Sequence, residues 1–482
     1  MKTKVLLRAD GHNKMGLGHI VRSLALAKML EHDFDCQFII REPSTAIREL
    51  IQMEGFSLIN LNDKVLIKHE AQYIAHHFLR GNEIMVLDGY HFDGAYQARI
   101  RKAVGKLVCI DDIFSTHFYA DSIINHTSGI AKNNYKTEAH SELKLGFEYL
   151  LLRQPFLEAA KHRNESKKTN KGKAAFICMG GADPNNHVLE ALSACIRKTE
   201  IQECNVVLGS AYQHHDALSD FIKINSIKVN IYSNLNADNM VVLMSNCDIA
   251  ICPPSTVALE FLCTGHQLIL LQTAENQVHL FRYLVSRGLA QSWDDFVANR
   301  QQEIRRDEIN RIFDGKSGRR LLKHFRALDY DMHCSFRKAT AGDMLLYFKW
   351  ANDPMTRAQS FHPDPIKIED HRGWFTKKLD DPKVMMYILE YKGRSVGQIR
   401  FGINGVALLS YSIDPSERGK SYGTYMVKKA ILQLEKDLDR SINIVGYVKK
   451  NNHASNRALS NLGFVPIASD RGTSIKYLLK AS

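Results

Sequence analysis

Short apolar runs that end in polar or charged residues recur along the first two thirds of the chain. Lys4–Arg8 leads into a glycine-rich turn, after which Ile20–Leu30 has apolar residues at helical spacing. Further runs of the same kind are Phe34–Ile40, Ile84–Asp88 and Lys106–Asp111. Buried parallel strands read as continuous apolar runs, and ligands bind at their C-terminal ends. The pattern predicts an α/β fold, with an N-terminal Rossmann-like domain over residues 1–160.

A polar, lysine-rich stretch, His162–Lys173, interrupts this pattern and predicts a domain boundary. The apolar runs then resume at Ala174–Met179, Val206–Gly209, Ile227–Tyr232, Ile249–Cys252 and Gln267–Leu271. They predict a second Rossmann-like domain over residues 174–327. We expect the two domains to face each other across a cleft, with ligands at the C-terminal ends of the strands.

The pattern changes from about residue 334 onward. Tyr387–Tyr391 and Ser395–Phe401 flank a Lys392-Gly393 turn, which is typical of an antiparallel hairpin. A third strand over Val406–Asp414, a glycine-containing loop and a helix ending near Leu438 follow. A fourth strand, Ile442–Val448, then leads to a helix that begins near Asn452. We therefore expect a separate α+β domain over residues 334–482.

The composition is that of a globular protein. The 482 residues suit roughly three domains of about 150 residues each. No apolar run approaches the roughly 18 residues needed to span a membrane, and Met1–Leu7 lacks the features of a signal peptide. The nine cysteines include no C-x-x-C pair, so we interpret them as reduced core residues without a metal site. These observations predict a cytoplasmic protein without a membrane span.

The net charge of +12 raises the question of an anionic partner. The basic excess is concentrated in Lys161–Lys173 and Arg300–Arg326, which look like a solvated linker and helix faces. Nucleic-acid binding is therefore not the favoured interpretation. An anionic small substrate, such as a nucleotide sugar or coenzyme A, accounts equally well for the charge.

Candidate chemistry in the first domain centres on two segments, Arg8-Ala-Asp10 and Met15-Gly-Leu-Gly-His19-Ile-Val-Arg22. Glycines let the backbone approach a ligand closely, and the following helix directs its amides toward an anion. A histidine at the mouth of such a cleft can take a proton from water near neutral pH. The alternative for His19 is a helix residue that hydrogen-bonds the loop.

Several motifs in order make residues 1–290 resemble the UDP-sugar hydrolases of pseudaminic acid biosynthesis, which are related to GT-B glycosyltransferases. The resemblance rests on Arg8-Ala-Asp10, Gly16-Leu-Gly18-His19, Leu87-Asp88, Ile110-Asp111-Asp112, Ile177-Cys-Met-Gly-Gly-Ala-Asp183, Ser255-Thr-Val-Ala-Leu-Glu260 and Asn276-Gln277. It implies a GT-B arrangement of the two domains. It also implies inverting hydrolysis of a UDP-linked 2,4-diacetamido-2,4,6-trideoxy sugar, with His19 as the general base and UDP as the leaving group.

The residues that the resemblance assigns to substrate and UDP binding each have a plainer alternative. Gly180 and Gly181 face phosphate or make a tight turn, and Glu260 accepts ribose hydroxyls or is a helix-surface charge. Asp111 and Asp112 are left without a role in the chemistry. The predicted binding residues are Arg8, Asp10, Gly16, Gly18, Gly180, Gly181, Asp183, Ser255, Glu260, Asn276 and Gln277.

Residues 334–480 resemble the GNAT family of acetyl-CoA-dependent N-acetyltransferases. The likeness rests on the loop Arg418-Gly-Lys-Ser-Tyr-Gly-Thr424, followed by Asn452-x-x-Ser455 and Gly463-Phe464. Backbone amides of such a loop hold the pyrophosphate of coenzyme A, and Ser421 stands where the family pattern has its first glycine. The resemblance implies acetyl-CoA as co-substrate. Its predicted contacts are Arg418, Gly419, Lys420, Ser421, Gly423, Thr424, Asn452 and Ser455.

The acid and base of acetyl transfer are left unassigned. Many GNAT enzymes have a tyrosine that protonates the thiolate, and its position is occupied by Leu459 here. The groups that could deprotonate the amine are His453, Tyr411 and Glu390, although packing or surface roles suit each of them better. Trp350-Ala-Asn-Asp353 and His371-Arg-Gly-Trp374 either line the acceptor side or pack in the core.

The two resemblances together predict a bifunctional enzyme of pseudaminic acid biosynthesis. In that pathway a GNAT enzyme acetylates a UDP-linked 4-amino-4,6-dideoxy sugar, and the hydrolase acts on the diacetamido product. The partners are therefore a UDP-linked amino sugar and acetyl-CoA. Two alternatives stay open: a GT-B glycosyltransferase fused to an acetyltransferase, and a non-catalytic nucleotide-sugar sensor that carries an acetyltransferase domain.

Overall fold

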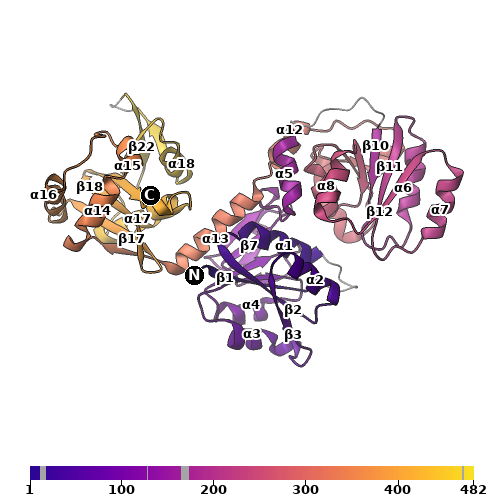
Figure 1. Cartoon of the computed structure of the whole chain (residues 1–482), viewed down its shortest axis with the longest axis horizontal. Helices are drawn as coiled ribbons and strands as arrows, with labels where there is room; N and C mark the ends of the chain where they lie inside the picture. The colour runs from indigo at the N-terminus through magenta and orange to yellow at the C-terminus, as the bar shows by residue number, and fades with distance from the viewer. Residues whose placement is uncertain (11–17, 128, 164–172, 469–471, 482) are drawn as a thin grey trace. The chain divides into compact units, whose positions relative to one another are not determined.

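The computed structural model describes residues 1–10, 18–127, 129–163, 173–468 and 472–481 (Figure 1). The chain divides into two compact units, unit 1 over residues 1–324 and unit 2 over residues 325–482. Gly16 and most of the lysine-rich stretch before Lys173 lie outside the described residues. The mixed α/β class expected from the apolar pattern is confirmed in both units.

The first sheet of unit 1 is parallel throughout and has the order β3-β2-β1-β4-β5-β7-β9. Its strands are β1 (Thr3–Ala9), β2 (Phe34–Arg41), β3 (Ser57–Leu61), β4 (Ile84–Asp88), β5 (Lys106–Ile110), β7 (Ser122–Asn125) and β9 (Glu142–Leu145). A small parallel pair is formed by β6 (His117–Phe118) and β8 (Lys136–Thr137). The helices are α1 (Gly18–Leu30), α2 (Thr45–Met53), α3 (Glu70–Phe78) and α4 (Gly94–Arg101). Leu6 and Met85 on one sheet face pack against Ile74 of α3 and Ile100 of α4.

The second sheet of unit 1 is also parallel, with the order β12-β11-β10-β13-β14-β15. Its strands are β10 (Lys173–Ile177), β11 (Ile201–Leu208), β12 (Lys228–Ser233), β13 (Ile249–Cys252), β14 (Gln267–Leu270) and β15 (Gln291–Ser292). Its helices are α5 (Gln154–His162), α6 (His187–Ile196), α7 (His215–Ile224), α8 (Ala237–Ser245), α9 (Thr256–Leu262), α10 (Val278–Ser286), α11 (Trp293–Val297) and α12 (Arg306–Ile312). One face packs against α5, α8 and α9 and the other against α6, α7 and α11, so the sheet is doubly wound.

Helix α5 packs against the second sheet, although most of its residues lie in the range predicted for the first domain. Phe156 and Leu157 lie in the core of the second sheet, although the apolar pattern assigns residues 1–160 to the first domain. Helix α13 (Ser317–His333) runs unbroken across the point where unit 1 ends at His324. The domain limits 1–160, 174–327 and 334–482 stay a prediction.

Unit 2 contains a seven-stranded sheet with the order β16-β17-β18-β19-β20-β22-β21. Its strands are β16 (Cys334–Lys338), β17 (Val384–Tyr391), β18 (Arg394–Asn404), β19 (Val406–Ile413), β20 (Ile444–Lys449), β21 (Val465–Ile467) and β22 (Ser474–Leu479). The helices besides α13 are α14 (Met344–Ala351), α15 (Pro354–Gln359), α16 (Ile368–Leu379), α17 (Tyr422–Leu438) and α18 (His453–Asn461). The predicted hairpin is confirmed, with Lys392 and Gly393 both at positive φ between β17 and β18.

Strands β19 and β20 are the parallel neighbours in this sheet, and they pair over a short length. Their register runs from Ala407 opposite Ile444 to Leu409 opposite Gly446. Beyond Leu409, Ser410–Ile413 continue β19 without a partner on β20. The pairing of the two strands therefore ends partway along the sheet, on the side from which β19 leads into the Arg418–Thr424 loop.

Candidate functional site

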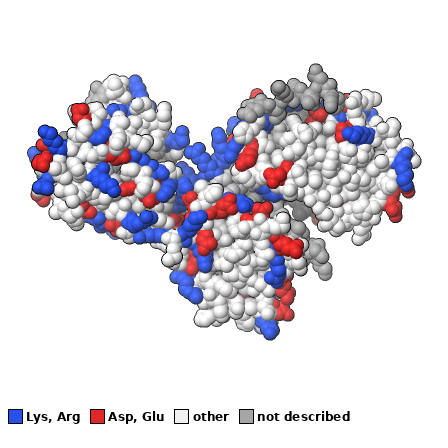
Figure 2. Space-filling model, viewed as in Figure 1, with Lys and Arg blue, Asp and Glu red and all other residues white. Residues whose placement is uncertain are grey.

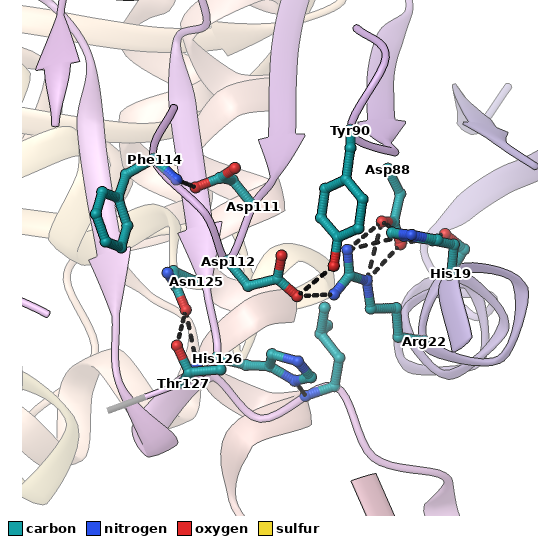
Figure 3. A network of polar contacts seen from close by, with 12 residues as sticks. His19, Arg22, Asp88, Tyr90, Asp111, Asp112, Phe114, Asn125, His126 and Thr127 are labelled. Atoms are coloured by element: carbon teal, nitrogen blue, oxygen red, sulfur yellow. Dashed lines mark hydrogen bonds and ion pairs between the residues drawn. The ribbon is translucent and has the colours of Figure 1, made fainter. Parts of the chain in front are cut away.

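The best-defined polar site of unit 1 is built around His19 on the first turn of α1 (Figure 3). His19 Nδ1 lies 2.7 Å from Oδ1 of Asp88, the last residue of β4. Arg22 Nη2 lies 2.9 Å from the same nitrogen. In the tautomer whose Nδ1–H donates to the Asp88 carboxylate, Nε2 is the nitrogen with a free lone pair. Asp88 is fully buried and His19 is 7% exposed, so the pair has limited access to solvent. It lies at the C-terminal end of β4, an interior strand of the sheet. This arrangement suits a histidine that accepts a proton.

Arg22, one helical turn after His19, fixes the carboxylate. Its guanidinium donates to Asp88 at 2.6–2.9 Å and to Asp112 Oδ2 at 2.9 Å, and Ser23 Oγ donates to Asp88 at 3.0 Å. Burial by itself would raise the pKa of Asp88, but Arg22 and His19 outweigh it and hold that pKa below its ordinary value. Asp88 is therefore ionised at neutral pH, and its negative charge compensates the positive charge that an imidazolium at His19 would carry.

Tyr90 and His126 complete the surroundings of this network (Figure 3). The Tyr90 hydroxyl donates to Asp112 at 3.2 Å, and its ring meets the His19 ring edge-on with centroids 4.9 Å apart. His126 accepts a hydrogen bond from the Leu151 amide through Nδ1, and burial together with Arg22 lowers its pKa to about 4. It is neutral at neutral pH. Sequence reasoning assigned no role to Arg22, Tyr90 or His126, although Tyr90 and His126 directly follow the ends of apolar runs.

Arg8 and Asp10 lie at the end of β1 and are engaged with each other. The Arg8 guanidinium is 1% exposed and bonds both Asp10 and Glu70, the latter at 2.8 and 3.1 Å. Glu70 also binds Arg41 and accepts from the Tyr96 hydroxyl at 2.8 Å. Arg8 therefore holds Asp10 in place, and a direct contact of its guanidinium with substrate stays a prediction. Gly18 opens α1, and a Cβ there would meet nothing within 4 Å.

The glycine loop after β10 is open on the side where a ligand would lie. Gly180 has φ +89°, and a Cβ added at Gly180 or Gly181 would meet nothing within 4 Å. Gly209 supports the loop from behind, since a Cβ there would fall 2.2 Å from the Gly181 carbonyl oxygen. Asp183, predicted to bind substrate, instead accepts from the amides of His187 and Val188 and caps α6.

Glu260, on α9, is buried and paired with a single arginine. Its two oxygens accept from Arg153 Nε and Nη2, each at 2.9 Å. Burial raises the pKa of Glu260 and Arg153 lowers it, with the net pKa above its ordinary value. Ser255 precedes α9, and its hydroxyl donates to the Pro253 carbonyl at 3.3 Å. A ribose at Glu260 would therefore have to share or replace the bonds to Arg153.

Asn276 and Gln277 lie in a short 3₁₀ helix before α10. The Gln277 side-chain oxygen accepts from the backbone amides of Thr273 and Ala274 at 2.8 and 3.2 Å. Gln277 thus closes its own loop, which a sequence pattern does not distinguish from a ligand contact. The Asn276 side chain is outside the described part of the structure.

In unit 2 the predicted coenzyme loop lies between β19 and α17. Gly419 has φ +79° and Ser421, the residue before α17, has φ +71°. The left-handed region is unfavourable for serine, so the position that departs from the glycine pattern keeps the backbone conformation of a glycine. Gly423 and Thr424 fall in the first turn of α17. Arg418 bonds Asp353 and Thr356, while Lys420 pairs with Glu417 at 2.9 Å.

Asn452 and Ser455 lie at the start of α18. Asn452 Oδ1 accepts from the Ser455 amide at 3.1 Å and caps this helix. The Tyr411 hydroxyl donates to Ser455 Oγ at 3.1 Å, and it comes from the part of β19 beyond the pairing with β20. Leu459 is buried in the core cluster of unit 2.

The other residues proposed for the acetyl-transfer site differ in their contacts. Glu390 pairs with Arg337 at 2.8 Å. Trp350 is fully buried, and its indole donates to Asp414 at 2.8 Å, which supports the packing interpretation for this tryptophan. Trp374 is half-buried and lies under the Arg400 guanidinium at 4.9 Å from ring centroid to Cζ. His453 is exposed on the first turn of α18.

No group of three or more His, Cys, Asp or Glu side chains is arranged to hold a metal ion in the described part of the chain. The described helices include none that is long and apolar enough to cross a membrane.

Different known proteins are similar to different parts of the chain. A family model described as an acetyltransferase (GNAT) domain matches residues 334–465. The UDP-2,4-diacetamido-2,4,6-trideoxy-beta-L-altropyranose hydrolase of Campylobacter jejuni is 27% identical over 293 residues, 59% of this chain and 97% of that protein. The spore coat polysaccharide biosynthesis protein SpsG of Bacillus subtilis is 27% identical over 58% of this chain and 81% of its own length. These matches confirm the resemblance to a hydrolase of this kind joined to a GNAT acetyltransferase.

A third relative extends over both units. The uncharacterized protein MJ1062 of Methanocaldococcus jannaschii is 25% identical over 403 residues, 78% of each chain. Because unit 1 comprises 324 of the 482 residues, a match of this length includes part of unit 2. The similarity to this relative therefore extends beyond unit 1.

Similar solved structures include acetyltransferases. Spermidine N-acetyltransferase from Vibrio cholerae is 16% identical over 31% of this chain and 95% of that chain, with a TM-score of 0.28. The aminoglycoside acetyltransferase AAC(6')-Ib is 17% identical over 30% of this chain and 94% of its own, with a TM-score of 0.27. The family match in residues 334–465 identifies acetyl-CoA as the co-substrate of the C-terminal domain.

Proposed function

We propose that the chain is a bifunctional nucleotide-sugar enzyme of pseudaminic acid biosynthesis. Unit 2 transfers an acetyl group from acetyl-CoA to the amine of a UDP-linked 4-amino-4,6-dideoxy sugar. Unit 1 hydrolyses the resulting UDP-2,4-diacetamido-2,4,6-trideoxy sugar, with inversion, to the free sugar and UDP. The two parallel sheets of unit 1 would take a GT-B arrangement with the substrate between them. A cytoplasmic location stays a prediction from the sequence.

The observation that carries the hydrolase half is the His19–Asp88 pair at the end of a parallel sheet. Nε2 of His19 takes a proton from water as the water oxygen attacks the anomeric carbon. The bond between that carbon and the UDP oxygen breaks, and the pair of electrons leaves with UDP. Asp88 supports the charge that His19 gains, and the Gly180–Gly181 amides stabilise the departing diphosphate. The similarity to the Campylobacter jejuni hydrolase, which spans 97% of that protein, supports this assignment.

For acetyl transfer, the loop before α17 would bind the pyrophosphate of acetyl-CoA through its amides. The acyl arm would pass along Asn452 and Ser455 into the region where β19 and β20 cease to pair. The substrate amine attacks the thioester carbonyl, the carbon–sulfur bond breaks and the thiolate takes up a proton. The product of this step carries the acetamido group that the substrate of the hydrolase requires, so the two reactions are consecutive.

The decisive test is incubation of the full chain with acetyl-CoA and UDP-linked 4-amino-4,6-dideoxy sugars, followed by mass spectrometry. We expect the acetylated UDP-sugar to appear first and the free diacetamido sugar and UDP to follow, without any added acceptor. A requirement for a sugar acceptor would identify unit 1 as a glycosyltransferase. UDP-sugar binding without turnover would identify it as a sensor.

A further inference from the structure

The two faces of the β18–β19 hairpin differ in what covers them. Ile399, paired with Tyr411, and Phe401, paired with Leu409, face the core beneath α17. The alternate residues of both strands therefore lie on the opposite face. On that face β17 contributes Met386 and Ile388, which pack under α14 and α16.

At the start of β19, over Val406–Ser410, this second face is uncovered, whereas Ser412 further along the strand is buried. Leu408 is 44% exposed and Val406 is 37% exposed, and Ser410 is exposed beside them. Cross-strand pairs place Arg400 opposite Ser410 and Gln398 opposite Ser412, so four polar residues adjoin each other on this surface. We call these residues, together with Leu408, the open face of β18–β19.

Arg400 is the charged residue at the centre of the open face, and it is half-buried. Its guanidinium lies over the Trp374 ring, and no carboxylate of the described residues lies within ion-pair distance of it. Burial lowers the pKa of Arg400, which still leaves the group charged at neutral pH. A partly buried cation without a counter-charge is costly unless an anion binds there.

Two other arginines of unit 2 are paired with carboxylates, which Arg400 lacks among the described residues. Arg337 bonds both Asp343 and Glu390, and Arg418 bonds Asp353. The side-chain amide of Gln398 is also only partly paired. Its Nε2 donates to Ser412 Oγ at 3.0 Å, while its buried Oε1 has no partner among the described residues. Among the described residues, Arg400 is therefore a cation without a counter-charge on the open face, and a buried amide oxygen without a partner lies two residues before it on the same strand.

The predicted coenzyme loop lies against the other face of the sheet. A Cβ at Gly423 would lie 3.5 Å from the Tyr411 ring, and Tyr411 is on the face beneath α17. An anion at Arg400 is therefore distinct from the pyrophosphate of the coenzyme. The acetyl acceptor is the other substrate of the reaction, and a nucleotide-linked amine carries two phosphates.

We propose that the open face of β18–β19 binds the acceptor, with Arg400 over Trp374 as the contact for the diphosphate of a nucleotide-linked amino sugar. This inference rests on the proposed acetyl transfer and names how unit 2 selects its substrate. Nucleotide-free amines make no use of Arg400.

The test compares the full-length wild type with Arg400→Gln and with Arg440→Gln, an exposed arginine just after α17 that serves as the matched control. Release of coenzyme A is measured with the UDP-linked amino sugar and with the same sugar without its nucleotide. Loss of a charge-assisted contact should raise the KM for the UDP-linked acceptor roughly 10- to 100-fold in Arg400→Gln. The KM values for acetyl-CoA and for the nucleotide-free sugar should stay unchanged. A rise for both acceptors, a rise for acetyl-CoA or no rise at all would overturn the proposal.

A binding measurement separates this inference from the proposed function. If the wild type acetylates no UDP-linked sugar, the proposed activity is wrong, and the anion site is then tested with inorganic pyrophosphate in the presence of saturating coenzyme A. Tryptophan fluorescence should change on binding in the wild type and in Arg440→Gln. The change should be absent in Arg400→Gln and in Trp374→Phe. An equal response in all four proteins would show that Arg400 binds no phosphate.

Discussion

At the scale of single residues, the charge balance around Asp88 explains how His19 can act as a base. The buried carboxylate accepts hydrogen bonds from His19, Arg22 and Ser23. When His19 takes a proton, the new positive charge appears next to an anion that is already ionised and oriented. Little of the surrounding structure has to reorganise, which is the condition under which an enzyme's electrostatic stabilisation is most effective.

Replacement of His19 by alanine tests this role. His19→Ala should lower hydrolytic turnover by about 10²- to 10⁴-fold, the usual contribution of a positioned general base, with little change in UDP affinity. The rise of the hydrolysis rate with pH that an imidazole base produces should disappear. His32→Ala, an exposed histidine at the end of α1, should keep the wild-type profile. Near-normal hydrolysis in His19→Ala would make His19 structural.

Glu260 offers a test of nucleotide binding. Glu260→Gln removes the charge that would accept ribose hydroxyls, so UDP affinity measured by calorimetry should fall roughly 10- to 150-fold. Turnover at saturating substrate should change less. Because Arg153 loses its partner in this variant, Glu158→Gln on the neighbouring α5 is the control for a general change of charge. Equal UDP affinity in wild type and Glu260→Gln would leave Glu260 as a structural ion-pair partner of Arg153.

Glu70 links the Arg8–Asp10 pair to the stability of unit 1. Burial alone would raise its pKa, but Arg8, Arg41 and Tyr96 lower it from 4.5 to about 2. A carboxyl group whose pKa is lower in the folded state stabilises that state at pH values above its unfolded-state pKa. This stabilisation is lost as the pH falls through the folded-state pKa. Glu70 is 2% exposed, so solvent screening is small, and its contribution at neutral pH is about 3 kcal/mol.

Glu70→Gln should therefore lower the free energy of unfolding at pH 7 by about 2 to 3 kcal/mol. The difference from wild type should shrink as pH falls from about 5 toward 2, where the wild-type carboxylate is protonated as well. Urea titrations of both proteins at pH 7 and at pH 3 measure this, with Glu49→Gln, at an exposed glutamate of α2, as control. A difference that is independent of pH would contradict the assigned role.

Single side chains were predictable where a motif places them next to a strand end, as with His19. Asp183 and Gln277 lie in the expected loops and bond the backbone of their own loop or helix, and their contacts with substrate stay a prediction. A carboxylate that caps a helix and one that binds a ligand occupy the same kind of position in a sequence. Arg22 and His126 became recognisable as partners of the site only when the fold brought β4, β5 and β7 together.

At the scale of elements, apolar runs predicted the long buried strands because both faces of a parallel sheet are covered. β4 and β13 begin and end at the expected residues. The two-residue strand β15 lies below the length at which a run is distinguishable from a loop. The apolar pattern does not show which core helix α5 joins, and its Phe156 and Leu157 pack in the core of the second sheet.

The loop before α17 provides a test at this scale. A side chain at Gly423 meets only ordinary contacts, the closest being the Tyr411 ring at 3.5 Å, so a substitution there should fold. Gly423→Asp places a negative charge where the coenzyme pyrophosphate should bind, and acetyl transfer should fall by at least about 100-fold while hydrolysis continues. Gly423→Ala adds the same Cβ without charge and should retain most activity. An unchanged KM for acetyl-CoA in a folded Gly423→Asp protein would contradict the loop assignment.

At the scale of the whole molecule, the two proposed reactions use separate sets of residues. The His19 network lies entirely within unit 1, and the loop, α18 and the open face of β18–β19 lie entirely within unit 2. Each unit has its own core. A substitution at one site should therefore remove one reaction and leave the other intact, and the product of unit 2 should reach unit 1 of another molecule through solution.

Mixing the two inactivated proteins tests this independence. His19→Ala alone should convert the UDP-linked amino sugar to its acetylated form and stop there, and Gly423→Asp alone should leave the amino sugar unchanged. An equimolar mixture should form the free diacetamido sugar and UDP, because the acetylated intermediate released by the first protein is the substrate of the second. Mass spectrometry over time should show a lag, and added excess Gly423→Asp should shorten it. If the mixture accumulates the intermediate while the wild type does not, the intermediate must pass between the two sites of one chain, and the reactions would not be independent.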